Sequence, residues 1–98
     1  MVRHVVMWKV KNSENKTSDI QRLKSALEDL EGKIKEIIDW EVAVDFSQKG
    51  EASCDIILIS SFTSEEDLHT YQIHPDHQKV VELVRTLTVE RRLVDYYF

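Results

Sequence analysis

Cysteine, proline and glycine are all scarce in this sequence: the 98 residues include one cysteine, one proline and two glycines. With Cys54 alone, the chain cannot form an intrachain disulfide or a thiolate metal cluster, which favours a reducing, cytoplasmic setting. Gly32 and Gly50 are too far apart to belong to one phosphate-binding glycine loop. We therefore expect no nucleotide cofactor, and the sequence indicates no other cofactor.

Long apolar runs and clustered basic residues are also missing. No stretch approaches the ~20 apolar residues that span a bilayer, and the opening run Val5–Trp8 is broken by Lys9 with no cleavage site after it. The net charge is −5, and the nearest approach to a basic patch is Arg91-Arg92, whose side chains would point to opposite faces of a strand. We expect a soluble domain with no membrane or nucleic-acid partner.

Four segments have the composition and alternation that are typical of β-strands. They cover residues 2–10, 37–46, 55–62 and 90–98. Both faces of the first segment carry apolar side chains, as in a strand that is covered on two sides. One of these faces holds Val2, His4, Val6, Trp8 and Val10.

A helix is expected between the first two strands. Ser18 and Gln21 have the spacing of a capping box, and Gly32 suits a left-handed cap beyond the last turn. Between these two signals, apolar residues recur at helical steps: Ile20, Leu23, Leu27 and Leu30.

A second helical region, interrupted near its middle, follows the third strand. Ser64 and Asp67 predict the start of a short helix, and Pro75 fits the first position of the next one, where its missing amide costs nothing. The order β-α-β-β-α-β predicts a single α+β domain over residues 1–98. Its fold would be ferredoxin-like, with a four-stranded antiparallel sheet and the helices on one face.

Helices on one face leave the other face of the sheet in need of a cover. We expect the uncovered face to carry large side chains of the first and third strands, namely His4, Val6, Trp8, Ile56, Leu58 and Phe62. Such a patch exceeds what soluble monomers usually expose. A second copy, packed sheet against sheet in a closed dimer, is the simplest cover. The chain is therefore expected to form a homodimeric α/β barrel.

Four stretches carry a family resemblance: RHVVMWKVK at residues 3–11, DIILISSF at 55–62, YQIHPDH at 71–77 and VDYYF at 94–98. Together they resemble the stress-responsive A/B barrel, or Dabb, domain, over nearly the whole chain. The resemblance implies a dimeric α/β barrel with an interior cavity. Many members of that family are known only as stress-associated proteins.

Some plant members resemble cyclases that close polyketide rings by an aldol condensation inside the cavity. By that resemblance His77 matches the histidine of the last helix, Tyr71 the tyrosine that acts with it, and His4 the histidine of the first strand. Asp95 matches the acidic residue of the closing D-Y element. Where the cyclase-like members have a further histidine, this sequence has Ile56, which makes that wall more apolar.

The role of these polar residues stays open between chemistry and packing. His77 could act as a base whose tautomer is fixed by Asp95, with Tyr71 as a hydrogen-bond donor. Alternatively, a hydrogen bond between His77 and Asp95 could simply pin the last helix to the last strand. The pair His74 and His77 has a metal-ligand spacing, but Pro75 disrupts the register between them, so no metal site is expected.

Three functions are consistent with the sequence. The first is binding of a small apolar or phenolic molecule in the barrel cavity, without catalysis. The second is a cofactor-independent, polyketide-cyclase-like lyase that uses His77 and Tyr71. The third, by analogy with the fold alone, is a cofactor-free monooxygenase. In each case the cavity is expected to be lined by His4, Val6, Trp8, Ile56, Leu58, Phe62, Tyr71 and His77.

Overall fold

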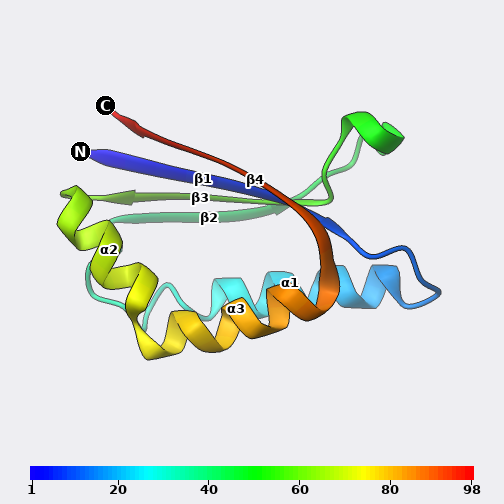
Figure 1. Cartoon of the computed structure of the whole chain (residues 1–98), viewed down its shortest axis with the longest axis horizontal. Coiled ribbons are helices and arrows are strands. Elements are labelled where there is room, and N and C mark those ends of the chain that lie inside the picture. The colour runs from blue at the N-terminus through cyan, green and yellow to red at the C-terminus, as the bar shows by residue number, and fades with distance from the viewer.

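The computed structural model describes all residues, 1–98, and contains one antiparallel sheet with three α-helices beneath it (Figure 1). The strand order is β2-β3-β1-β4, so that β2 and β4 form the edges. This arrangement confirms the predicted ferredoxin-like fold, with the second helix divided in two. The elements are β1 (Val2–Val10), α1 (Lys16–Glu28), β2 (Asp39–Val44), a 3₁₀ turn (Gly50–Ala52), β3 (Ile56–Phe62), α2 (Glu65–Ile73), α3 (Pro75–Leu87) and β4 (Thr88–Tyr97).

Local capping signals placed the second helical region correctly. The Ser64 hydroxyl accepts a hydrogen bond from the Asp67 amide at 3.1 Å, which fixes the start of α2. Pro75 opens α3, as predicted, and the imidazole of His74 caps that helix by accepting from the Asp76 amide at 3.1 Å. The chain therefore turns sharply between α2 and α3 and loses no helix-end hydrogen bond at His74.

Two predictions around the first helix are wrong. The helix begins at Lys16, with Asn15 in the cap position, and the Ser18 hydroxyl donates to the Asn15 carbonyl inside the first turn. Ser18 is therefore not a cap, because the helix already includes it. Gly32 is not a left-handed cap either, since helix α1 ends at Glu28 and the only glycine with a positive φ is Gly50.

Strand β2 is shorter than predicted at both ends. It stops at Val44 because the carboxylate of Asp45 accepts hydrogen bonds from the Gln48 amide and the Ser47 hydroxyl, which turns the chain. Phe46, expected in the strand, is 94% exposed.

The helices cover the face of the sheet that was expected to be open. Val6, Trp8 and Leu58 pack in one buried cluster with Leu23 of α1 and Val84 of α3. A second cluster joins Phe62 to Tyr71 of α2, and His4 is only 3% exposed. The prediction of the exposed face is wrong because β1 carries apolar residues on both faces. The more uniformly apolar face meets the apolar stripes of the helices.

The opposite face is therefore the open one; it carries apolar side chains, together with Arg3 and Arg92. Its residues alternate along β1 and β3 with the buried set, and Val5 stands between Ile59 of β3 and Val94 of β4 in the sheet register. Several are substantially exposed, including Val94 at 60% and Tyr96 at 42%. We call this surface the open face; its apolar residues include Val5, Met7, Ile57, Ile59, Val94 and Tyr96.

None of the helices is both long enough and apolar enough to cross a membrane.

Candidate functional site

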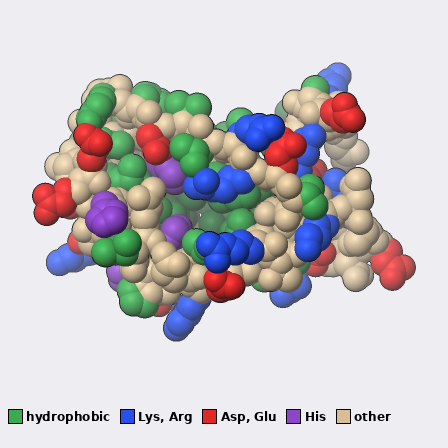
Figure 2. Space-filling model, in the orientation of Figure 1, with side chains coloured by type: hydrophobic (Ala, Val, Ile, Leu, Met, Phe, Trp, Pro, Cys, Tyr) green, Lys and Arg blue, Asp and Glu red, His purple; other side chains and the backbone are tan.

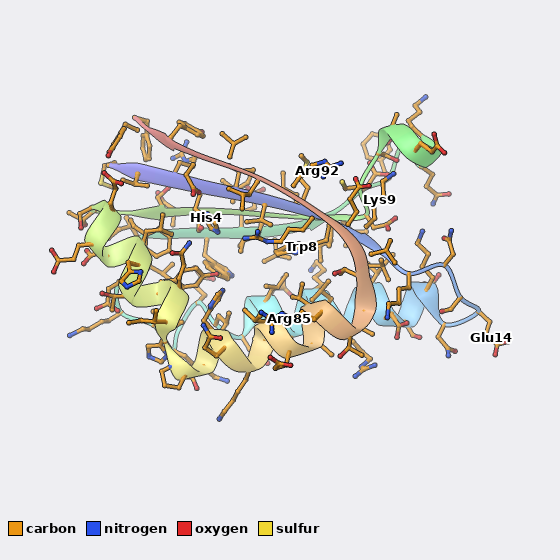
Figure 3. All side chains as sticks on the ribbon, in the orientation of Figure 1. His4, Trp8, Lys9, Glu14, Arg85 and Arg92 are labelled. Carbon is orange, nitrogen blue, oxygen red and sulfur yellow. The ribbon has the colours of Figure 1, made fainter.

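A cavity of about 420 Å³ lies between the helix-covered face of the sheet and helix α3. Figure 2 shows its opening as a hollow in which hydrophobic and histidine side chains are visible between basic ones. In Figure 3, His4 and Trp8 extend from the sheet on the side of the helices, and Arg85 extends from α3. The cavity is lined by His4, Val6, Trp8, Leu27, Leu58, Tyr71, His77, Val80, Val81, Val84, Arg85 and Arg91.

Tyr71 is the buried aromatic residue at one end of this cavity. Its ring is 1% exposed, and its centroid lies 5.1 Å from that of Phe62 and 4.3 Å from that of His77. Burial raises the pKa of its hydroxyl well above the ordinary value, and the charge of Arg91 offsets part of that rise. The phenol therefore stays protonated across the physiological range and is available as a hydrogen-bond donor.

His77 is held in one tautomer by the break between α2 and α3. Because α2 ends at Ile73, the Gln72 carbonyl has no partner in its own helix and accepts from His77 Nδ1 at 2.9 Å. A carbonyl only accepts, so Nδ1 carries the proton and Nε2 is left with its lone pair. Burial lowers the pKa of this imidazole, and the hydrogen bond to Gln72 offsets part of that effect. At neutral pH the imidazole of His77 is thus uncharged, with its proton on Nδ1 and Nε2 free to act as a base.

The expected bond between His77 and Asp95 is not present. Asp95 instead accepts a hydrogen bond from Nδ1 of His4. The reason is the register of the sheet: His4 of β1 and Asp95 of β4 are direct partners, so both side chains project from the same face. His77 lies on α3 and is turned toward Gln72.

The two tryptophans near the cavity differ in their hydrogen bonding. Trp40 donates its indole N–H to the Leu27 carbonyl at 3.0 Å. Trp8 lines the cavity and is 5% exposed, yet its buried Nε1–H has no acceptor in the protein. A buried donor without a partner is uncommon and costs free energy.

Residues 2–98 match the sequence pattern of the Stress responsive A/B Barrel Domain family, Dabb. The chain belongs to this family. The resemblance inferred from the motifs is therefore confirmed. No curated protein matches the sequence of this chain.

Several solved structures share the fold of this Dabb domain. A dimeric protein of unknown function from Bacteroides fragilis NCTC 9343 is 29% identical, with a TM-score of 0.88, covering 99% of this chain and 95% of that one. The hydroxynitrile lyase from Passiflora edulis is 17% identical, with a TM-score of 0.83 and coverage of 97% and 90%. An antibiotic biosynthesis monooxygenase is 11% identical, with a TM-score of 0.76 and coverage of 100% and 98%. The latter two likenesses concern the fold alone.

The Dabb domain brings together most of the side chains singled out from its sequence. His4, Val6, Trp8, Leu58, Tyr71 and His77 all line the one cavity. Ile56 and Phe62 do not: each is 2% exposed or less and packs in a core cluster, on the same face but away from the cavity wall. Asp95 reaches the site only through His4.

No group of three or more histidine, cysteine or acidic side chains is placed to hold a metal ion. His74, which with His77 has a metal-ligand spacing in the sequence, uses its imidazole to cap α3.

Sequence reasoning missed the two arginines of the cavity. Arg91 of β4 lies opposite Trp8 in the register, and Arg85 comes from the last turn of α3. The signal was available: in a strand, Arg91 shares its face with Asp95, four residues away. Beside Arg92, Arg91 resembles only a weak basic patch in the sequence.

Proposed function

We propose that this Dabb domain binds a small, largely apolar molecule in the cavity and acts on it as a cofactor-independent lyase by proton transfer. The observation that carries this proposal is the fixed tautomer of His77. Its Nδ1 donates to the Gln72 carbonyl, so Nε2 keeps its lone pair, and His77 lines a cavity that Tyr71 also lines. The same hydrogen bond also satisfies a carbonyl at the end of α2, and the contact between His77 and Tyr71 is what adds support for chemistry.

The two residues would share one proton-transfer step. Nε2 of His77 takes a proton from a carbon next to a substrate carbonyl, so that the C–H bond breaks and an N–H bond forms. The electron pair moves to the carbonyl oxygen, and the Tyr71 hydroxyl donates to the enolate that develops there. The enolate then attacks a second carbonyl or expels a leaving group, and His77 returns the proton. The ring centroids of His77 and Tyr71 lie 4.3 Å apart, so the two side chains are direct neighbours.

The environment of each residue supports its assigned role. Burial keeps His77 unprotonated at neutral pH and Tyr71 protonated. His4, fixed by Asp95, lies across the cavity with its ring centroid 6.2 Å from that of Tyr71. The Passiflora edulis hydroxynitrile lyase supports the proposal only as an example of lyase chemistry on this fold. The monooxygenase hypothesis rests on fold likeness alone.

The test is hydrogen–deuterium exchange at carbon. The protein is incubated in D₂O with 4-phenylbutan-2-one, and deuterium next to the carbonyl is followed by NMR. We expect His77→Gln to slow catalysed exchange by about 10²–10⁴-fold, while circular dichroism shows an intact fold. His69→Gln is the matched control, because His69 is an exposed histidine of α2. Exchange that is equal in His77→Gln and wild type would refute the proposal.

We further propose that the working form is a homodimer paired through the open face. Its exposed apolar side chains support this, as does the dimeric state that is described for the Bacteroides fragilis protein. Ile59→Lys places a charge in the open face and is expected to give a monomer by native mass spectrometry. Ile73→Lys, at an exposed position in α2, is the control that should stay dimeric. A monomeric wild-type protein would contradict this part of the proposal.

A further inference from the structure

Trp8 and Arg91 form a pair across the sheet at the mouth of the cavity. They are direct partners in the register of β1 and β4, and both line the cavity. Arg91 itself is solvent-exposed, whereas Trp8 is buried. The buried indole N–H donor of Trp8 and the exposed cation of Arg91 therefore belong to neighbouring residues of the cavity lining.

Neither member of this pair has a partner of its own within the protein. The Trp8 Nε1–H has no acceptor. Arg85 pairs with Glu82 at 3.2 Å and Arg92 pairs with Glu90 at 3.8 Å. Arg91 takes part in none of the ion pairs of the chain. Two hydrogen-bond donors without partners, on adjacent strands, can together bind a ligand group that accepts hydrogen bonds.

The two arginines among the residues that line the cavity are basic, although the protein as a whole is acidic. The net charge is −5, yet the twelve lining residues include Arg85 and Arg91 and no aspartate or glutamate. The influence of Arg91 reaches inward, since its charge lowers the pKa values of both Tyr71 and His77. Because Arg85 is paired with Glu82, Arg91 is the arginine of the lining that is left to attract an anion.

We propose that the ligand of this cavity is a small carboxylate, whose carboxyl group binds the Arg91 guanidinium and the Trp8 indole N–H while its apolar body lies between the sheet and α3. This inference rests on the proposed function, because it names the class of substrate on which His77 and Tyr71 would act. The apolar body matches the walls, which are formed by valine and leucine side chains such as Val6, Leu58 and Val84.

A carboxylate fits these donors better than a phosphate group does. The planar fork of an arginine matches a carboxylate with two parallel hydrogen bonds, and the indole adds one donor. A phosphate dianion would need more donors than this rim offers, and no glycine-rich loop supplies backbone amides. A volume of about 420 Å³ is within the range of cavities that hold small molecules.

The test compares 3-phenylpropanoate with its uncharged analogue, 3-phenylpropanamide, by isothermal titration calorimetry at pH 7. We expect the acid to bind wild type at least about tenfold more tightly than the amide, since hydrogen bonds to a charged group are the stronger ones. Arg91→Gln should abolish this preference, and Arg91→Lys should restore part of it. The preference should weaken as salt is raised, because Arg91 is exposed.

The chain offers its own controls. Arg92→Gln changes an adjacent arginine that lies on the other face of the sheet (Figure 3), and it should leave the preference unchanged. In ¹H–¹⁵N spectra the acid should move the indole N–H signal of Trp8. The signal of Trp40 is the internal reference, because its N–H already donates to Leu27.

Each other outcome overturns the inference. Equal binding of acid and amide, no binding of the acid at millimolar concentration, or an equal loss in Arg92→Gln would each remove the carboxylate site. Displacement of 3-phenylpropanoate by an equal concentration of inorganic phosphate would show a general anion site instead. The neutral ketone has no carboxyl group for Arg91 to bind, and Arg91→Gln is expected to change only the pH dependence of its deuterium exchange. The proposed lyase chemistry can therefore stand or fall separately.

Discussion

Replacing Asp95 with alanine tests the hydrogen bond that joins the two central features of the site, the buried histidine of β1 and the edge strand β4. The substitution leaves the Nδ1–H of His4, a residue 3% exposed, without its acceptor. An unsatisfied buried donor costs about 1–3 kcal/mol. The side chain of Asp95 is itself 38% exposed, so water can approach and we expect the lower part of that range, about 1–2 kcal/mol.

The assay is urea unfolding at one fixed protein concentration, arranged as two double-mutant cycles. Asp95→Ala is combined first with His4→Ala and then with His77→Ala. We expect a coupling free energy of about 1 kcal/mol with His4, and additivity within about 0.5 kcal/mol with His77. The thermal midpoint of Asp95→Ala should fall by about 5–15 °C. A larger coupling with His77 than with His4 would refute the pairing and restore the contact that the sequence had indicated.

Three further predictions concern the cavity. Tyr71→Phe keeps the buried ring and removes only the hydroxyl, so we expect deuterium exchange to slow by about 10²-fold while the urea midpoint stays near that of wild type; a large loss of stability would mean that the hydroxyl serves the fold. Catalysed exchange should fall as pH is lowered through the pKa of His77, which lies below the ordinary 6.5. Arg91→Gln should move this fall in rate to higher pH, because the positive charge of Arg91 opposes protonation of His77. NMR titration of the imidazole checks the direction. Leu27→Ala, which empties space between α1 and the cavity, should cost about 2–5 kcal/mol in urea unfolding, and a cost under about 1 kcal/mol would indicate that the cavity collapses around it.

Features of the fold that depend on neighbouring residues could be predicted from the sequence. The extent of β1, the cap at Ser64 and the start of α3 at Pro75 are as predicted, since each depends on a few adjacent residues. The cap at Ser18 failed because the helix begins at Lys16, one turn of chain earlier, although Asn15 in the cap position makes no side-chain hydrogen bond. A helix that starts without a side-chain cap leaves no local signal of its first residue in the sequence.

Features that depend on contacts between distant segments could not be predicted in the same way. Alternation divides β1 into two faces but does not say which face the helices cover, and this led to the wrong exposed surface. The partner of Asp95 depends on the register between β1 and β4, which are joined by most of the chain. His77 and Tyr71 share a site because the helix break turns them together, and the sequence indicated the break but not its angle.

The edge position of β4 has a thermodynamic consequence. Successive residues of this one strand serve different equilibria: Arg91 and Asp95 belong to the cavity side, and Val94 and Tyr96 to the open face. If a ligand and a second subunit both favour the same arrangement of β4, each must strengthen the other by an equal factor. Ligand affinity would then vary with protein concentration, and titrations below and above the dimer dissociation constant would give different values.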